Sequence, residues 1–344
     1  GLPDGTVDAG TLATNSVTEA KIATDSVTTT KIPAALENTF VSGRKNLFIN
    51  GGFDVWQRGT SLAGATSYLA DRWFNGTTET QSRQTFTVGQ TDVPHNPTYY
   101  HRGTSGSTEW YGLKQAIENV GITAGREVTL SYWMKGSSAF TNAPYRGQYF
   151  GSGSGGSSEV NAALSTASIT TSWARYTHTF TLPSISGKTV GASNYMQINL
   201  IRANVNNITI DLANCQLEFG DTATDFEHRS YGEELALCQR YYHIMKPALA
   251  GSGFGVGMAY SSTVLFTQVF FPTVMRARPT KSFSAIGDFR ILYGTGTKTA
   301  TDSETQVGTY GGRLGWTTSG LTAGDGVMVD AGNTSVYLDF DAEL

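Results

Sequence analysis

The chain has 344 residues and a net charge of −4, from 24 Lys or Arg and 28 Asp or Glu. The basic residues form no cluster, so we expect neither nucleic-acid binding nor attraction to an anionic membrane. The apolar runs are far shorter than the ~20 residues that span a bilayer, and the first residues lack a signal-peptide core. The 40 glycines, with only 15% charged and 11% aromatic residues, indicate an all-β protein of about two domains with many turns.

Residues 1–43 repeat at ten-residue spacing. Each unit carries two apolar positions, namely Val7, Leu12, Val17, Ile22, Val27 and Ile32. Two apolar side chains per unit cannot bury a core within one chain, so the spacing predicts identical chains lying side by side. We therefore expect an extended oligomeric stalk over residues 1–43. The alternative is a disordered linker rich in Thr and Ser. The chain begins in mid-repeat at Gly1, which either removal of a Met or a missing upstream segment explains.

Alternating apolar and polar residues predict strands along the rest of the chain. Asn46–Trp56 is typical of a strand, a tight turn and a second strand. The other strands expected before residue 228 are Arg83–Val88, Glu127–Met134, Ala174–Leu182, Met196–Leu200 and Asn207–Phe219. Those expected in residues 248–344 are Gly253–Tyr260, Val264–Phe271, Lys281–Ile286, Phe289–Tyr293, Gly326–Val329 and Val336–Phe340. Their spacing predicts a small C-terminal β-sandwich.

One helix is predicted between these β regions, over Ser230–Met245 within a linking segment 229–247. Ser230 can cap its N-terminus, with Glu233 in the capping-box position, and Pro247 stops it. Two apolar stripes follow helical spacing: Leu235, Cys238, Tyr242 and Met245, and Leu237, Tyr241 and Ile244. Two apolar faces indicate burial from both sides, as near a trimer axis. The alternative is a helix packed between two domains of one chain.

Several large or reactive side chains are predicted to be buried. Cys215 and Cys238 lie in apolar patterns and are expected to be free buried thiols rather than a disulfide. Four tryptophans are interpreted as core or packing residues: Trp56, Trp73, Trp133 and Trp173.

The order of several segments resembles that of β-jelly-roll carbohydrate-binding modules, as they occur inside bacteriophage tail proteins. These segments are Asn46–Arg58, Ala70–Trp73, Gly125–Lys135, Ser172–Thr181 and Ile208–Glu218. Phe219–Tyr242 and Phe271–Thr280 are similar to junctions in phage tail fibre proteins, and the ten-residue units resemble the Val-Thr-x-x-Lys-Ile repeats of such fibres. The resemblance covers nearly the whole chain. It implies a jelly roll over residues 44–228, followed by the helix and a C-terminal sandwich over 248–344.

The function implied by the resemblance is that of a structural virion protein. A homotrimer on a tail or surface appendage, assembled in the host cytoplasm, would bind host-surface polysaccharide without cleaving it and would contact other tail or capsid proteins. One rival is a purely structural protein that cements neighbouring virion subunits. The other is a tailspike-like glycan depolymerase. A bacterial adhesin with an upstream secretion signal is a more distant alternative.

Sugar binding needs flat aromatic rings for pyranose faces and polar side chains for hydroxyls. Aromatic residues in loops rich in Gly, Ser and Thr, with Arg nearby, are therefore the glycan-binding candidates. They are Trp110, Tyr111, Tyr145, Tyr149, Tyr310, Arg313 and Trp316. Contacts between subunits are an equally good interpretation of these loops.

The resemblance also implies a structural Ca²⁺ between the first strand's turn and the last strand. Asp211 matches the last-strand Asp of such modules, and Asp54 falls near the first-strand position that Glu usually fills. Calcium prefers six to eight oxygen ligands. Where such modules often have two adjacent acids, this chain has Asp211-Leu212, which favours the alternative that Asp211 is a plain strand-end hydrogen-bonding residue and that the calcium site is absent or incomplete. We expect no enzyme: acids are sparse, and there is no HExxH, GxSxG or CxxC motif.

Overall fold

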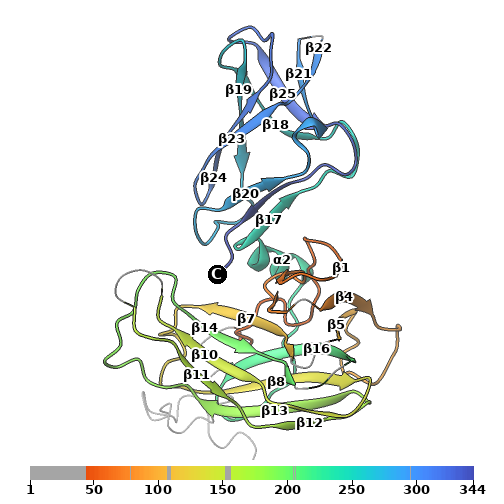
Figure 1. Ribbon diagram of the computed structural model, residues 1–344, viewed down its shortest axis with the longest axis vertical. Helices are drawn as coiled ribbons and strands as arrows, with labels where there is room; N and C mark the ends of the chain where they lie inside the picture. The colour runs from red at the N-terminus through yellow and green to blue at the C-terminus, as the bar shows by residue number, and fades with distance from the viewer. Residues whose placement is uncertain are drawn as a thin grey trace, which may run out of the picture.

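The computed structural model describes residues 44–344 except 78, 107–109, 152–155, 204, 206 and 295. The predicted stalk, with Val7, Leu12, Val17, Ile22, Val27 and Ile32, lies outside the described residues. The described chain forms two β domains joined by one short helix (Figure 1). The predicted all-β architecture, with a jelly roll followed by a sandwich, is confirmed.

The first domain consists of two six-stranded antiparallel sheets. Sheet A has the order β1 (Ser61–Leu62), β4 (Thr80–Thr85), β5 (Tyr99–Ser105), β16 (Ile208–Phe219), β8 (Glu127–Gly136) and β13 (Ala174–Thr181). Sheet B has the order β11 (Val160–Ala163), β10 (Tyr145–Tyr149), β14 (Tyr195–Asn199), β7 (Leu113–Glu118), β3 (Phe74–Asn75) and β2 (Ser67–Tyr68). Two short ribbons join β12 (Ala167–Ile169) to β9 (Phe140–Asn142) and β15 (Arg202–Ala203) to β6 (Trp110–Tyr111).

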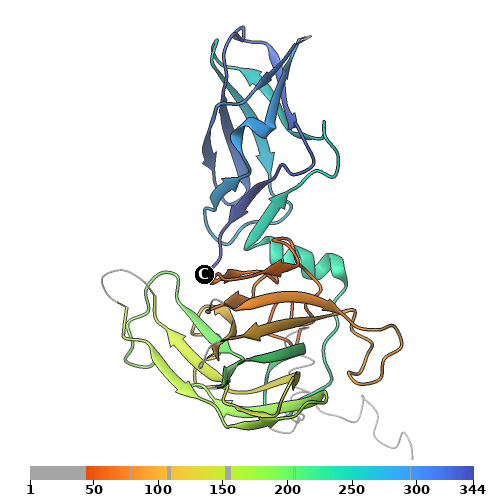
Figure 2. The same ribbon diagram turned by 45° about the vertical axis from the view of Figure 1, so that its right-hand side comes forward.

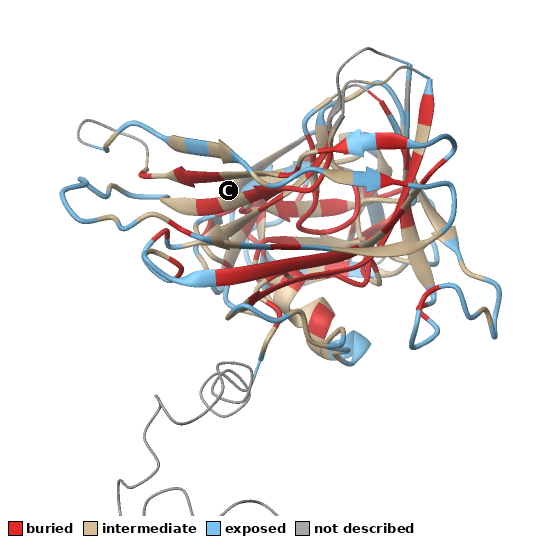
Figure 3. Ribbon diagram, turned by 90° about the horizontal axis from the view of Figure 1, so that it is seen from below, coloured by how far each residue is buried: buried red, intermediate tan, exposed pale blue. Residues whose placement is uncertain are grey.

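The core of this domain lies between the two sheets. Strands place alternate side chains on opposite faces, so one set from each strand points inward. In β8 the inward set is Val128, Leu130, Tyr132 and Met134, all fully buried. Phe48, Phe53 and Trp73 fill one end, with ring centroids 5.1 Å apart for Phe48 and Trp73. Figure 3 shows buried residues along the strands and exposed residues at many of the turns.

The predicted strands that alternate clearly are confirmed in β8, β13, β14 and β16. The prediction for Arg83–Val88 was shifted, because β4 is Thr80–Thr85. Asn46–Trp56 contains the expected tight turn but no strand. Several of its backbone N–H groups donate to side chains rather than to a neighbouring strand. Trp56 and Trp73 are buried as predicted, whereas Trp133 and Trp173 pack half-buried outside the core.

The second domain is a sandwich of a three-stranded and a seven-stranded sheet. The first has the order β17 (Tyr242–Met245), β26 (Leu338–Asp341) and β20 (Thr280–Phe283). The second has the order β22 (Gly296–Thr299), β21 (Phe289–Tyr293), β25 (Gly326–Ala331), β18 (Gly253–Ala259), β19 (Val264–Phe270), β24 (Gly311–Thr317) and β23 (Asp302–Val307). Along the sequence, the 3-10 turn η3 (Ile286–Asp288) lies between β20 and β21. Phe289, Trp316 and Phe340 occupy the core.

The linking helix is shorter than predicted. Helix α2 spans Tyr231–Gln239, and the Ser230 side chain caps it by accepting a hydrogen bond from the Glu233 backbone N–H at 3.3 Å. The predicted second half is instead strand β17, which pairs with β26. The Tyr-His-Ile-Met run of β17 suits an extended strand, and its backbone groups form hydrogen bonds with β26. In the described part of the chain, no helix has the length and apolar character to cross a membrane.

The residues predicted to face a trimer axis, Leu235, Cys238 and Tyr242, pack largely within one chain. Cys238 and Tyr242 are buried in the single chain, which agrees with the alternative of a helix packed between two domains. Leu235 is half-buried, and its predicted role at a trimer axis stays a prediction. Cys215 and Cys238 are free and buried, as predicted.

Charged pairs join the two domains. Arg58 contacts Asp71 at 3.3 Å in the jelly roll, and Asp341 at 3.1 Å and Glu343 at 3.3 Å in the sandwich. Its guanidinium also lies 3.5 Å from the centroid of the Tyr242 ring. Figure 2 shows the sandwich standing on the helix and the first strands of the jelly roll. These contacts hold the C-terminal end of the chain against the first domain.

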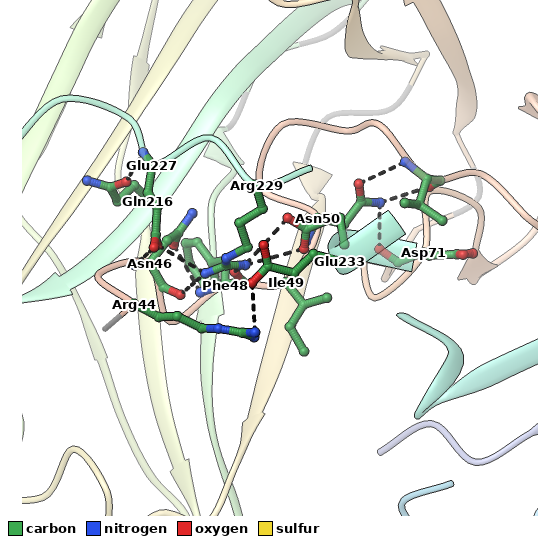
Figure 4. Close-up of polar contacts among 12 residues, drawn as sticks. Arg44, Asn46, Phe48, Ile49, Asn50, Asp71, Gln216, Glu227, Arg229 and Glu233 are labelled. Carbon is green, nitrogen blue, oxygen red and sulfur yellow. Dashed lines mark hydrogen bonds and ion pairs between the residues drawn. The ribbon is translucent and has the colours of Figure 1, made fainter. Parts of the chain in front are cut away.

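The turn before the first strand is held by side chains rather than by a ladder (Figure 4). Asn50, at φ 58°, bonds through its amide to Val55 and to the carbonyl of Asp71 at 3.0 Å. Arg229 donates to the carbonyls of Asn46 at 2.5 Å and Phe48 at 3.0 Å. This network fastens the segment entering α2 to the start of the domain.

Candidate functional site

The outer face of sheet B carries a continuous set of aromatic and polar side chains. Met196 and Ile198 of β14 point into the core, so Tyr195, Gln197 and Asn199 point outward. Strand pairing places further side chains beside them in rows across the sheet. The set, called the sheet B face below, comprises Tyr68, Phe74, Lys114, Ala116, Glu118, Tyr145, Gly147, Tyr149, Asn161, Tyr195, Gln197 and Asn199.

Two tyrosines form an aromatic platform on this face. Tyr149 and Tyr195 are paired in register between β10 and β14, with ring centroids 4.7 Å apart and an interplanar angle of 25°. Both are half-buried. Partial burial and the nearby charge of Glu159 raise the pKa of Tyr195, so its hydroxyl stays protonated and able to donate. A stacked pair at an open face suits the apolar side of a sugar ring.

Polar groups surround the platform and are given room by a glycine. A Cβ added at Gly147 would lie 2.4 Å from Oδ1 of Asn161 and 3.1 Å from Oε1 of Glu159. Only glycine therefore lets both side chains reach over β10 onto the face. Burial lowers the pKa of Lys114, and the charge of Glu159 opposes that shift. The face thus offers a carboxylate, an amide and an ammonium within one area, which can bond sugar hydroxyls.

The strands of the face are bounded at both of their ends. At one end the Arg202 guanidinium lies 5.9 Å from the centroid of the Tyr145 ring, and Arg202 pairs in register with Tyr111 of β6. At the other end the Gly191 backbone N–H donates to the carbonyl of Phe150 at 2.7 Å. Across the strands, the face extends to the edge strand β11.

Comparison with protein families matches this first domain. Residues 45–193 match the family model of a carbohydrate binding domain. The match covers strands β1 to β13, and β14 and β16 complete the two six-stranded sheets. The matched residues therefore contain most of the strands of the jelly roll.

Solved structures of low identity are similar to parts of this chain. The CBM22-2 xylan-binding domain of Paenibacillus barcinonensis Xyn10C is 13% identical, with 43% of this chain and 92% of that chain covered and a TM-score of 0.33. The N-terminal cellulose-binding domain of Cellulomonas fimi β-1,4-glucanase C is 19% identical, with 37% and 83% covered and a TM-score of 0.26. The enzymatically active domain of bacteriophage CBA120 tailspike protein 4 is 12% identical, with 51% and 21% covered and a TM-score of 0.31. No curated protein matches the sequence.

Of the predicted glycan-binding residues, two lie together on the matched domain. Tyr145 and Tyr149 are on the sheet B face, in strand β10 rather than in the predicted loop. Trp110 and Tyr111 form β6, whose backbone pairs with β15 at the Tyr145 end of the face. Their side chains lie outside what the structure describes.

The three candidates in the sandwich are far from this arrangement in the fold. Trp316 was a wrong prediction for a sugar platform, because it is only 1% exposed, packs on Phe289 and donates to Thr267 at 3.0 Å. Strand β24, not a loop, carries it inward. Tyr310 is 73% exposed, and Arg313 donates to Gln306 at 2.6 Å. These two stay predictions.

Sequence reasoning missed half of the platform. Tyr195 and Gln197 were absent from the candidates, although alternation in this strand was the signal that could have found them. Its apolar members point inward, which leaves Tyr195, Gln197 and Asn199 on the opposite face. Lys114 and Glu159 had no comparable sequence signal, because pairing of β7 with β14 brings Lys114 to the face, and Glu159 lies just before β11 beside Gly147.

The two predicted calcium ligands do not share a site. Asp211 accepts two hydrogen bonds from Arg102, at 2.7 and 2.8 Å, and its carboxylate lies 3.8 Å from the Lys135 ammonium. Its charge is therefore already balanced within β5, β8 and β16, and the interpretation of Asp211 as a hydrogen-bonding residue agrees with the structure. Asp54 lines a different hollow, of about 100 Å³, together with Asn214.

The Asp54 hollow has the features of an oxygen-donor site. Both amide atoms of Asn214 are buried without a hydrogen-bond partner in the described chain. The Asp54 carboxylate likewise has no hydrogen-bond donor among the described residues. In that part of the chain, no three or more His, Cys, Asp or Glu side chains are grouped so that they could hold a metal ion. Asp54 and Asn214 are the side chains that would contribute oxygens to a structural calcium in this hollow.

Asp54 also borders a larger hollow of about 570 Å³ beside α2. It is lined by Asp54, Trp56, Gln57, Arg83, Thr98, Tyr99, Arg229 and Tyr231. Several of these groups are already used within the chain. Trp56 donates to the carbonyl of Phe53 at 2.5 Å, and Gln57 donates to Asp71 at 2.7 Å. We therefore place the candidate site on the sheet B face rather than here.

Asp54→Asn is expected to stabilise the protein at pH 7.5 and to have little effect at pH 4. Burial and the charge of Glu234 raise the pKa of Asp54 to about 6 from an ordinary 3.8. The folded state therefore favours the neutral acid, and the ionised form costs stability above pH 6 but not below pH 4. Two pKa units correspond to roughly 3 kcal/mol, which partial exposure reduces to about 1–2 kcal/mol.

Urea unfolding at both pH values, with EDTA present, measures this effect. An equal change at pH 4 and pH 7.5 would contradict it. Repeating the pH 7.5 measurement with calcium in place of EDTA tests the hollow as an ion site. A calcium-dependent rise in the wild-type midpoint that Asp54→Asn removes would assign the ion to Asp54.

Proposed function

We propose that the protein is a non-catalytic, homotrimeric virion appendage, a phage tail fibre or a related structure, that binds host-surface glycan on the sheet B face. The observation that carries this proposal is the stacked pair Tyr149 and Tyr195 within a polar, open sheet face of a domain that matches a carbohydrate-binding family. Ten-residue spacing in residues 1–43 supports the trimeric stalk.

The way in which the face uses its acids supports binding without cleavage. Glu118 continues the row of Tyr149 and Tyr195, and its carboxylate is held by Arg240 at 2.9 and 3.2 Å. Glycoside hydrolysis needs two carboxyl groups free to act on opposite sides of a bond. Glu159 can still accept hydrogen bonds from sugar hydroxyls. In a trimer, three weak sites act at high effective concentration, so millimolar contacts can give firm attachment.

Replacing Tyr149 by Ala should weaken glycan binding at least about tenfold, corresponding to roughly 1.4 kcal/mol of lost stacking. The binding panel is β-1,4-xylan, barley β-glucan and lipopolysaccharide from candidate hosts, measured by calorimetry and affinity electrophoresis. Tyr310→Ala is the matched control, because it removes an exposed tyrosine from the sandwich and should leave binding unchanged. Tyr149 lies at the surface, so the variant should keep its fold.

The rivals predict other outcomes. A protein that ignores every polysaccharide while remaining trimeric would be a structural cement, and release of oligosaccharides would indicate a depolymerase. Loss of binding in Tyr310→Ala alone would move the site to the sandwich. Light scattering on the same samples should give three chains of 36.8 kDa, about 110 kDa.

A further inference from the structure

The last residues of the described chain lie on the sheet B face. The carbonyl of Leu344 accepts a hydrogen bond from the Tyr68 hydroxyl at 3.2 Å. Leu344 borders a hollow of about 100 Å³ whose other lining residues are Tyr68, Phe74, Lys114, Ala116, Tyr195 and Gln197. Tyr195 belongs to the aromatic platform, so one hollow lies between the platform and the end of the sandwich domain. In Figures 1 and 2 this end of the chain reaches down to the jelly roll.

This C-terminal segment is firmly held. Glu343 is ion-paired with Arg72, and Arg58 lies 3.3 Å from the other carboxylate oxygen. Arg276 donates to the carbonyls of Ala342 at 2.7 Å and Glu343 at 2.8 Å. The side chains of Arg72 and Glu343 are 1% and 5% exposed. Residues 342–344 are therefore a fixed part of the surface beside β2 and β3.

A second segment of the junction covers the neighbouring row. Arg240, which follows α2, donates to Glu118 of β7. The row of Tyr149, Tyr195 and Glu118 thus ends at Arg240, and the row of Gln197 and Ala116 ends at Leu344. Arg240 and Leu344 together form what we call the junction wall. It stands on the β7 side of the platform, whereas β11 on the opposite side is an edge strand.

We infer that the junction wall closes one end of the site, so that the sheet B face takes the terminal sugars of a glycan chain rather than an internal stretch. This inference rests on the proposed glycan binding. A polysaccharide that lies across the strands and passes Tyr195 enters the hollow lined by Phe74 and Tyr68, where it meets the junction wall. A site open at both ends admits internal segments, but a wall at one end leaves room for a chain end only.

The number of sheet B faces bound per polysaccharide chain tests this inference. Calorimetry on the intact protein with xylohexaose and with xylan of known mean length, and with cellohexaose and barley β-glucan, gives that number. The expected result is one sheet B face bound per glycan chain, for the short and the long ligands alike. A number that grows with polymer length would overturn the inference while leaving glycan binding intact. If the protein binds none of the four ligands and no lipopolysaccharide, the proposed function and this inference both fail.

Opening the wall should reverse the result. Arg240→Ala combined with Leu344→Gly leaves the buried Glu343 contacts in place and should raise the number of sheet B faces bound per polymer chain several-fold. Arg278→Ala combined with Leu249→Gly makes the same chemical changes at exposed positions of the sandwich and should keep the wild-type value. Unfolding midpoints confirm that both variants fold. The inference would be overturned if the wall variant folds and binds glycan, and one sheet B face is still bound per polysaccharide chain.

Discussion

Arg72→Met is expected to lower the free energy of unfolding by about 3–5 kcal/mol, because it leaves a buried carboxylate without its main partner. The Arg72 guanidinium pairs with Glu343, donates to the carbonyl of Ala116 at 2.6 Å and lies 3.4 Å from the centroid of the Tyr241 ring. Methionine keeps a Cβ at this position of φ 71°, so backbone strain is the same in both proteins. The measured loss then reports the charge and its contacts.

Calorimetric unfolding at pH 7.5 measures this loss, with two variants as controls. Arg240→Ala removes a half-exposed pair with Glu118 and should cost no more than about 1 kcal/mol. Arg72→Met combined with Glu343→Leu removes both buried charges and should recover most of the stability. A single variant that loses less than the Arg240 control would show that the junction does not depend on this pair.

The sequence predicts those parts of the fold that local alternation determines. Glu127–Gly136 alternates because one face of β8 packs in the core. The start of α2 at Ser230 follows from capping alone. The end of α2 could not be found in this way, since Tyr242–Met245 has an apolar pattern that suits either structure. Its partner β26 lies almost a hundred residues later, and tertiary pairing decides between helix and strand.

The candidate site shows the same division. Tyr145 and Tyr149 were chosen for their chemistry, but Arg146 and Gly147 between them made the segment resemble a loop. Only pairing with β14 and β11 makes it a strand and brings Tyr195 to Tyr149. Trp316 shows the opposite error, because glycines around it suggested a turn. In β24 those glycines permit close approach, as a Cβ at Gly312 would lie 2.3 Å from the carbonyl oxygen of Gln306.

Ion pairs between the domains are beyond any local pattern. Arg58 and Glu343 are separated by most of the chain, and the charge of each is unremarkable in its own segment. Their meeting decides how the sandwich sits on the jelly roll, and with it the position of Leu344 on the sheet B face. A site built partly by a second domain therefore becomes visible only in the structure.

Gly51→Ala is expected to destabilise the protein by about 3 kcal/mol, whereas the same change at the adjacent Gly52 should cost less than about 1 kcal/mol. A Cβ at Gly51 would lie 2.2 Å from the carbonyl oxygen of Cys215, so the turn or β16 must move. The Cys215 N–H donates to the Gly51 carbonyl at 2.9 Å, and that bond would stretch with the movement. At Gly52 the nearest atom, 2.9 Å away, is Oδ2 of Asp54.

The two glycines differ in what their neighbours can do, and this makes them a matched pair. A carboxylate at the end of a side chain can rotate away, but a carbonyl inside the twelve-residue strand β16 cannot. Urea unfolding followed by tryptophan fluorescence compares the two variants under one condition. Equal losses would mean that the turn adapts to a methyl group at either position, and that the approach of Gly51 to β16 does not fix the start of the domain. A large loss of stability in Gly51→Ala alone would show that the contact of Gly51 with Cys215 sets the register between the turn and β16, the last strand of the jelly roll. This contact precedes every strand of sheet A in the sequence.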